Sequence, residues 1–147
     1  MINIPKTDLR VHPLCLGANV FGWSADEQES NAVLDAYASH GGNFIDTADA
    51  YSQWKPGNQG GESETLIGHW LKKKDRKKFV IATKVALLNT RPGLSAANIL
   101  AACDDSLRRL QTDYIDIYYS HRDDAKVPME ETLGAYDKLI KAGKVRY

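Results

Sequence analysis

Short apolar segments alternate with longer amphipathic segments along this chain, and glycines or polar loops separate them. Strands are predicted for the apolar segments 12–16, 44–46, 79–83 and 114–119. Helices are predicted to begin near residues 24, 62, 95 and 128. Strands that alternate with helices of this length form βαβ units around a parallel sheet. The pattern therefore predicts an α/β fold of four β/α units, with residues 1–147 as a single domain.

Local signals define the ends and faces of the predicted helices. Ser24 and Glu27 match the capping-box pattern, so the first helix is expected to run from there to about His40. Ser95 is the expected N-cap of the third helix, and Pro128 suits the first turn of the fourth. The faces expected to be buried carry apolar residues at helical spacing: Val33, Ala36, Tyr37 and His40, then Leu66, Ile67 and Trp70, then Ile99, Leu100, Cys103, Leu107 and Leu110, and finally Leu133, Tyr136, Leu139 and Ile140.

The charge of the chain is balanced, with 19 Lys and Arg residues against 19 Asp and Glu residues. Nothing in this balance attracts the chain to nucleic acid or to an anionic membrane. The densest basic stretch, residues 72–78, ends a helix pattern, where cations complement the helix dipole. Residues 1–6 lack the apolar core of a signal peptide, and no segment reaches membrane-spanning length. We therefore expect a cytoplasmic protein without nucleic-acid or membrane partners.

The cysteines and three of the histidines offer no metal site. Cys15 lies in a strand pattern and Cys103 in a helix pattern, and both are expected to be small buried hydrophobes in a reducing compartment. His12, His40 and His69 have no partner at metal-ligand spacing. No metal is expected. Residues 17–22 lack the glycine spacing of a dinucleotide-binding loop, which disfavours a Rossmann fold.

Four titratable residues lie at or just after the ends of predicted strands. Asp46, Lys84 and His121 each close a strand, and Tyr51 follows Asp46 by five positions. Right-handed crossovers place the carboxyl ends of parallel strands on one face, so the four side chains can meet there. Each residue alone has a structural alternative, as a cap, a solvated strand end or a loop aromatic. The ordered set favours a catalytic site, because α/β barrels carry their catalytic groups at these strand ends.

These residue types suit the protonation of an oxygen on which negative charge develops. A phenol has a pKa of about 10 in water, and a nearby ammonium favours its ionised form. Lys84 can supply that charge beside Tyr51, and Asp46 can orient Lys84. His121 can hydrogen-bond a substrate oxygen. Such a site fits the reduction of a carbonyl, which requires an external hydride donor, normally a nicotinamide cofactor.

Five motifs resemble the amino-terminal half of the aldo-keto reductase family. They are Phe44-Ile45-Asp46-Thr47-Ala48 with Tyr51, Gly61-Glu62-Ser63-Glu64 with Gly68, Thr83-Lys84-Val85, Asp113-Tyr114-Ile115-Asp116 leading to His121, and Lys141-Ala142-Gly143-Lys144-Val145-Arg146. The resemblance extends from about Leu9 to Tyr147. It implies a parallel (β/α)8 barrel of the TIM type, of which about the first four β/α units are present.

The resemblance also assigns roles to individual residues. It implies a catalytic tetrad of Asp46, Tyr51, Lys84 and His121, in which the tyrosine is the general acid. It further implies reduction of aldehydes or ketones with NADPH, or alternatively with NADH. His121 would orient the substrate carbonyl.

Loop residues around this tetrad are the candidates for ligand contacts. Asn19 and Val20, together with Asp46, are expected to contact the cofactor by the same resemblance. Trp23 and Trp54 are candidates for substrate binding, with His121; a cover over the barrel rim is the alternative for the two tryptophans.

A complete barrel of this type needs about 250 residues, and residues 144–147 resemble the start of a fifth strand. We therefore expect a truncated half barrel, because members of the family hold the cofactor phosphates with later loops. Three interpretations stay open. The chain is an NAD(P)H-dependent carbonyl reductase, or an inactive half barrel that acts only by assembly with itself or with a complementary carboxyl-terminal half, or a regulatory binding protein on a reductase scaffold.

Overall fold

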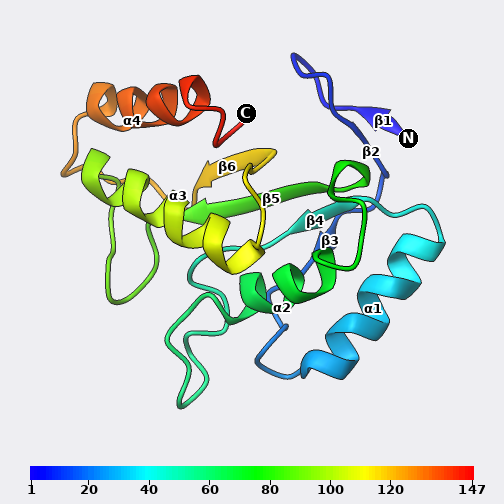
Figure 1. Ribbon diagram of the computed structural model, residues 1–147. Helices are drawn as coiled ribbons and strands as arrows, with labels where there is room; N and C mark the ends of the chain where they lie inside the picture. The colour runs from blue at the N-terminus through cyan, green and yellow to red at the C-terminus, as the bar shows by residue number, and fades with distance from the viewer.

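The computed structural model describes residues 1–147 and shows a parallel sheet with helices packed along it (Figure 1). In chain order the elements are β1 (Ile2–Asn3), β2 (Arg10–Val11), β3 (Leu16–Gly17), α1 (Glu27–Ser39), β4 (Phe44–Asp46), α2 (Glu62–Leu71), a 3-10 turn (Arg76–Lys78), β5 (Val80–Val85), α3 (Ala96–Leu110), β6 (Ile117–Ser120) and α4 (Met129–Lys141). The four-stranded sheet has the order β3-β4-β5-β6, and all its pairs are parallel. The predicted α/β fold with four β/α units is confirmed.

The strands differ from the predicted ones mainly at the amino terminus. The first strand of the sheet is β3, which covers residues 16–17 instead of 12–16. It pairs only with β4, a strand of three residues, so it extends no further than β4 offers partners. The preceding residues form an antiparallel hairpin of β1 and β2, which the sequence analysis missed. Cys15 therefore lies outside the sheet and is exposed, contrary to expectation, whereas Cys103 is buried.

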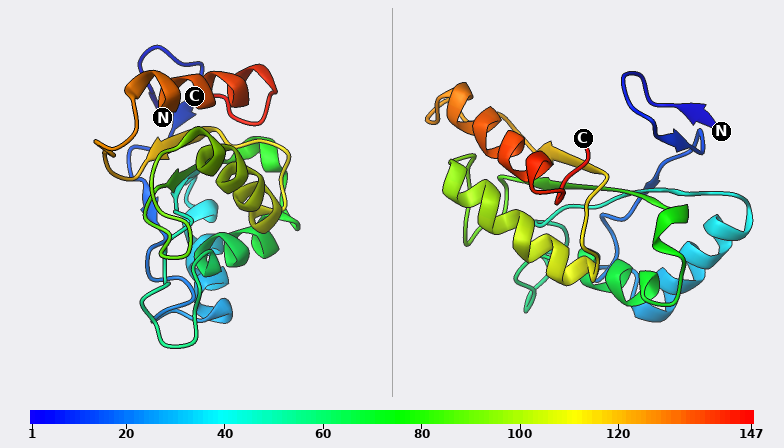
Figure 2. Two further views of the ribbon diagram at one scale, coloured as in Figure 1. Left: turned by 90° about the vertical axis from the view of Figure 1, so that its left-hand side faces the viewer. Right: turned by 45° about the horizontal axis from the view of Figure 1, so that its top comes forward.

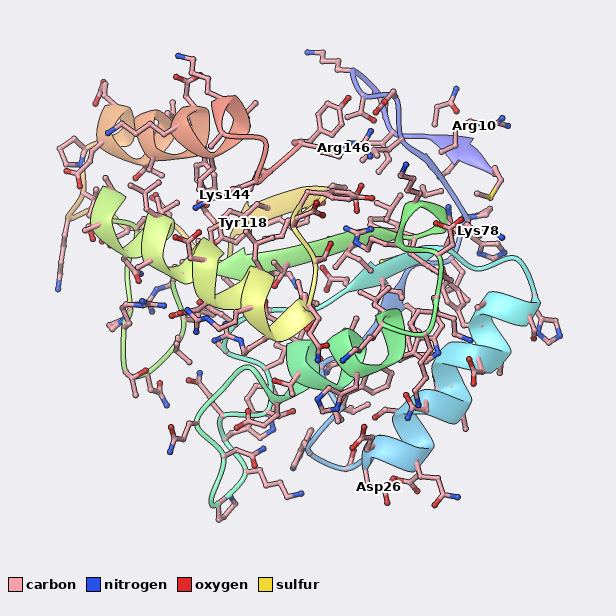
Figure 3. All side chains as sticks on the ribbon, viewed as in Figure 1. Arg10, Asp26, Lys78, Tyr118, Lys144 and Arg146 are labelled. Atoms are coloured by element: carbon pink, nitrogen blue, oxygen red, sulfur yellow. The ribbon has the colours of Figure 1, made fainter.

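The carboxyl-terminal residues begin a fifth parallel strand beside β6, as predicted. Val145 pairs with Ile115, and the Arg146 N–H donates to the Ile115 carbonyl at 3.0 Å. The same segment reaches the amino-terminal hairpin (Figures 2 and 3). There Arg146 donates to both oxygens of Asp8, at 2.8 and 2.9 Å, and the Tyr147 hydroxyl donates to Asp8 at 2.9 Å.

Helix α1 starts two residues later than predicted. The capping box consists of Asp26 and Glu29, whose side chains accept each other's backbone N–H at 2.9 and 3.0 Å (Figure 3). Ser24 belongs instead to a turn, in which its N–H donates to the Val20 carbonyl at 3.2 Å. This turn uses the backbone groups that a helix starting at Ser24 would need. The other predicted cap is correct, because Ser95 accepts the Asn98 N–H at the start of α3.

The buried faces of α1 and α4 also differ from the predicted ones. In α1 the buried side chains are Ser30 and Leu34, while Val33 is 43% exposed. In α4 Leu139 is buried as expected, but Leu133 is 57% exposed. The exposed side of α4 also carries Met129 and Ile140. These two helices lie at the ends of the helical layer, and each packs against one neighbouring helix only, α2 and α3 respectively. Part of each apolar face therefore has no partner in this chain.

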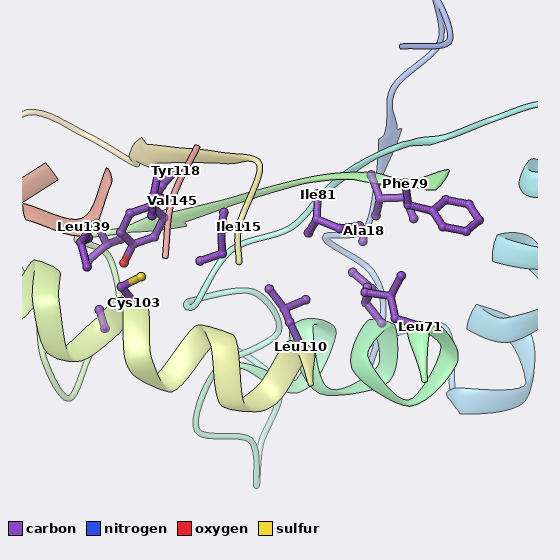
Figure 4. Packing of buried hydrophobic residues seen from close by; sticks show 14 of the residues in the cluster. Ala18, Leu71, Phe79, Ile81, Cys103, Leu110, Ile115, Tyr118, Leu139 and Val145 are labelled. Atoms are coloured by element: carbon purple, nitrogen blue, oxygen red, sulfur yellow. The ribbon is translucent and has the colours of Figure 1, made fainter. Parts of the chain in front are cut away.

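The main core lies between the sheet and the helices α2 and α3 (Figure 4). Ile45 and Ile81 point into it from β4 and β5, and Ile115 from the segment just before β6; each is 0% exposed. Cys103 and Leu110 meet them from α3. Gly68 lets α2 approach α3 closely, because a Cβ at this position would overlap the Arg109 carbonyl.

A smaller cluster lies on the opposite face of the sheet, beneath the amino-terminal hairpin. It joins Leu9 and Val11 to the sheet residues Val80, Ala82 and Ile117. This second face is the inner face of the curved sheet, away from the helices α1 to α3. None of the helices is both long and apolar enough to cross a membrane.

Candidate active site

The strand register brings Asp46, Lys84 and His121 to one place on the inner face. Asp46 pairs with Ala82, so Lys84 lies two residues beyond that pair on β5. Lys84 in turn pairs with Tyr119, so His121 lies two residues beyond on the segment after β6. Side chains alternate between the two faces of a strand, and a step of two residues keeps the same face. The three side chains therefore project from the same face, each one step further along its strand.

The Lys84 ammonium is held by three acceptors. Its Nζ donates to Asp46 Oδ2 at 2.6 Å, to the Tyr51 hydroxyl oxygen at 2.8 Å and to the Thr47 carbonyl at 2.9 Å. An ammonium has three N–H donors, so every one of them is used. The side chains of Lys84 and Asp46 are 14% and 25% exposed. This partial burial and the full set of partners fix the charge in position.

Tyr51 lies in the loop between β4 and α2, with its hydroxyl on the ammonium. Because Lys84 donates to this oxygen, the phenol proton points elsewhere. Its nearest protein acceptor is Asp46 Oδ2 at 3.4 Å, which is long for an O–H bond. The proton is thus free for a bound ligand. The ammonium also lies 4.6 Å from the centre of the ring, which adds a cation–π contact.

His121 faces the Tyr51 ring from the other strand end. The two ring centres are 5.7 Å apart at an interplanar angle of 74°. The His121 N–H donates to the Val85 carbonyl at 2.8 Å, which fixes its backbone to β5. Burial, and secondly the charge of Lys84, lower the pKa of His121 below its ordinary value. Its Nδ1 is buried without a protein partner, and the lowered pKa favours the neutral imidazole.

Two tryptophans flank the outer side of Tyr51. Trp54 lies 6.4 Å from the Tyr51 ring and 5.5 Å from Trp23, in edge-to-face geometry. Both tryptophans are nearly half exposed, at 46% and 47%. They form an apolar wall beside the phenol, on the surface of the molecule.

The loop after β3 runs beside Asp46. The Ala18 N–H donates to the Asp46 carbonyl at 2.9 Å, so the next residues pass the end of β4. Asn19 is exposed and Val20 is half-buried. Asn19 thus presents an exposed amide, and Val20 a half-buried apolar side chain, close to the end of β4.

Polar groups that were not predicted from the sequence support this site from the helical side. Thr83, between the inward-facing residues of β5, points to the helices and donates to Glu64 at 2.6 Å. Glu64 also accepts from Arg109 Nε at 2.7 Å and is 0% exposed. The alternation of side chains along β5 could have predicted that Thr83 faces the helices, because Lys84 next to it faces the site. Asp49, in the loop that carries Tyr51, is buried as well, and no sequence pattern marked it.

Comparisons with known proteins give a consistent result. The model of the Aldo/keto reductase family matches residues 13–147. Norsolorinic acid reductase B of Aspergillus parasiticus is 37% identical, over 97% of this chain and 40% of its own length. An uncharacterized 11.2 kDa protein of Pseudescherichia vulneris is 53% identical over 85 residues, which cover 56% of this chain and 82% of that protein.

The structural comparison agrees with the sequence comparison. The holo form of the aldo-keto reductase AKR11C1 from Bacillus halodurans superposes with a TM-score of 0.82 at 36% identity, over 97% of this chain and 46% of that one. The chain therefore spans about half, or less, of the length of these reductases. Its parallel sheet corresponds to part of their TIM barrel, as predicted. With the family model matching nearly its whole length, the chain belongs to the aldo/keto reductase family.

Proposed function

We propose that this protein takes part in the reduction of aldehydes or ketones to alcohols with NADPH, and that Tyr51 is the general acid. The observation that carries this proposal is the contact of one ammonium with both Asp46 and Tyr51, at 2.6 and 2.8 Å. Its relatives, among them norsolorinic acid reductase B of Aspergillus parasiticus, support a reductase.

The proposed chemistry follows from the positions of the protons. A nicotinamide cofactor, when bound, would supply the hydride that adds to the carbonyl carbon. Tyr51 gives its free proton to the carbonyl oxygen, which yields the alcohol and leaves a phenolate. Lys84 stabilises that phenolate from 2.8 Å, and Asp46 keeps the ammonium in place. His121, neutral and partly buried, donates to the carbonyl oxygen and orients it.

The residues present fit one end of the cofactor. Asn19, Val20 and Asp46 are the proposed contacts for the nicotinamide, because their loops meet beside Lys84. Arg91 is paired with Asp105 and Arg109 with Glu64, so these two guanidinium groups are engaged within the chain. NADPH, rather than NADH, is an expectation from the family.

The substrate side of the site is proposed to be Trp23, Trp54 and His121. The two tryptophans offer apolar edges next to the phenol, which suits a flat or apolar carbonyl compound.

A complementary carboxyl-terminal half, or a second copy of the chain, is the proposed partner. At one edge of the sheet, β3 pairs only with β4. At the other edge, the only part of the chain that lies beyond β6 is the short segment Val145–Tyr147. Leu133 and Ile140 of α4 are exposed at 57% and 47%. Open strand edges and an uncovered helix face favour assembly with further β/α units.

A chimaera tests the function directly. Residues 1–147 are joined to the complementary half of the Bacillus halodurans reductase, and NADPH consumption is followed with a reactive aromatic aldehyde. We expect turnover in the chimaera and little or none in the 147-residue chain alone. Tyr51→Phe should lower kcat by about 100-fold or more, the usual contribution of a general acid.

Tyr119→Phe is the matched control, because Tyr119 lies on the same face beside Lys84 and its hydroxyl makes no hydrogen bond to the protein. It should leave kcat nearly unchanged. A folded chimaera without turnover would refute the proposed function. Turnover that survives Tyr51→Phe would refute the role of the phenol alone.

A further inference from the structure

Asp49 lies between two residues of the site, three positions after Asp46 at the end of β4 and two before Tyr51 in the following loop. Its side chain is among the most buried carboxyls of the chain, with the residue 1% exposed. Its backbone N–H donates to the Lys84 carbonyl at 3.1 Å. The loop that carries Tyr51 is thus tied to the strand that carries Lys84 through Asp49 itself.

Neither carboxyl oxygen of Asp49 has a hydrogen-bond partner in good geometry, and the one donor close to it is the backbone N–H of its neighbour Ala50. Charged and titratable groups face it from four directions: Glu64 of α2, Arg109 of α3 and Arg91 of the loop before α3, Tyr118 of β6, and Tyr136 of α4. The Tyr118 hydroxyl is buried without a partner too. Several polar groups therefore surround Asp49, and none of them donates a hydrogen bond to it.

The nearby cations are committed to other carboxylates. Arg109 donates to Glu64 at 2.7 Å, and Arg91 is paired with Asp105. Glu64 receives a second bond, from Thr83 at 2.6 Å. Two neighbouring buried carboxylates are costly when both are ionised, and only one of the two has strong hydrogen-bond donors here. That carboxylate is Glu64.

We propose that Asp49 is a positioning residue that acts as a buried, uncharged acid, holding the Tyr51 loop against β5 so that the phenol stays on Lys84. Ionisation of Asp49 drives its side chain toward water, because the arginines nearby are paired with other carboxylates and compensate the buried charge only in part. The loop then opens, and Tyr51 leaves the ammonium. The role assigned to Tyr51 rests on the proposed function, whereas the state of the loop does not.

The direction of the pH dependence follows from linkage. Burial, and secondly the charge of Glu64, raise the pKa of Asp49 from 3.8 to about 7, and the two arginines oppose this only in part. An acid with a raised pKa in the folded state stabilises that state fully below its ordinary pKa, and this contribution is lost as the pH rises toward the folded value. Opening of the loop should therefore become about 50-fold more favourable between pH 5 and pH 7, after correction for intrinsic exchange.

Hydrogen exchange of residues 47–61 in the 147-residue chain, followed across this pH range, measures the opening. Asp49→Asn keeps the size of the side chain and cannot ionise. In this variant the protection of residues 47–61 against hydrogen exchange, corrected for the intrinsic rate, should stay the same between pH 5 and pH 7. Asp113→Asn is the control, since Asp113 is exposed and makes no ion pair. It should behave like the unchanged chain.

A carbon-13 titration of the aspartate carboxyls gives a reading on the unchanged chain, even if Asp49→Asn does not fold. One buried carboxyl should titrate near pH 7. If every aspartate titrates near its ordinary value, or if the loop opens with the same pH profile in Asp49→Asn, the inference is wrong.

In the chimaera, Asp49→Asn should keep turnover at a pH where that of the parent falls. Absence of turnover in both would refute the proposed function and leave the exchange result to decide the inference.

Discussion

The pair of Glu64 and Arg109 allows a sharp test of how the helical layer supports the site. Glu64 is 0% exposed, and its carboxylate accepts hydrogen bonds from Arg109 Nε at 2.7 Å and from Thr83 Oγ1 at 2.6 Å. Arg109→Met keeps a long side chain under α2 and removes the charge. Breaking a buried pair from one side costs about 3–5 kcal/mol, because the remaining charge has no counter-ion. The bond from Thr83 survives, so we expect about 3 kcal/mol.

Urea unfolding, followed by fluorescence of the buried Trp70, measures this loss. With a slope of about 2 kcal/mol per molar urea, the midpoint should fall by about 1.5 M. Lys141→Met is the matched control, since it removes the pair with Asp137 on the exposed side of α4, where the side chains are 74% and 56% exposed. An exposed pair of this kind contributes about 0.3–0.5 kcal/mol.

A second substitution separates charge from packing. Glu64→Gln in the Arg109→Met background replaces the unpaired carboxylate with a neutral amide, which Thr83 can still hydrogen-bond. The double variant should recover about 1–2 kcal/mol relative to Arg109→Met. Two results would contradict this prediction: a loss of unfolding free energy in Arg109→Met no larger than in Lys141→Met, or no recovery on adding Glu64→Gln. Either would show that Arg109 does not stabilise the charge of Glu64.

Three further substitutions test the packing and the helix ends by the same unfolding assay. Gly68→Ala should destabilise the protein by about 1–3 kcal/mol, because its Cβ would push α2 away from the Arg109 carbonyl. Gly134→Ala, in α4 with nothing within 4 Å of the new Cβ, should instead stabilise it by about 1 kcal/mol; equal effects at the two glycines would contradict the close contact of α2 and α3. Ser95→Ala should cost about 1 kcal/mol by removing the cap on the Asn98 N–H, and an unchanged midpoint would show that the cap contributes nothing.

Much of the fold could be predicted because its signals are local. The motif from Phe44 to Asp46, the cap at Ser95 and the apolar stripe of α3 each lie within one element, and each is found in the structure. The errors concern signals that compete with neighbours. At α1 a turn ending near Ala25 displaced the capping box from Ser24 to Asp26, and backbone hydrogen bonds of that turn decided the outcome.

The candidate site divides in the same way. Asp46, Lys84 and His121 were found from the sequence because strand ends are visible in the apolar pattern, and the structure brings them together with Tyr51. Their catalytic roles, and the ligand contacts of Asn19, Val20, Trp23 and Trp54, stay predictions. Asp49 could not be found, because an aspartate in a polar loop looks solvated until the packing around it is known.

By itself, then, the sequence determined the order of β/α units and which residues end the strands, since both follow from hydrophobic periodicity and turn residues along the chain. Only the tertiary structure decided the register of the strands, in which Asp46 pairs with Ala82 and Lys84 lies two residues further along β5. It also decided which helix faces are covered and which carboxyls keep a partner. Exposure and charge pairing are properties of neighbours that lie far apart in sequence, and no local pattern carries them.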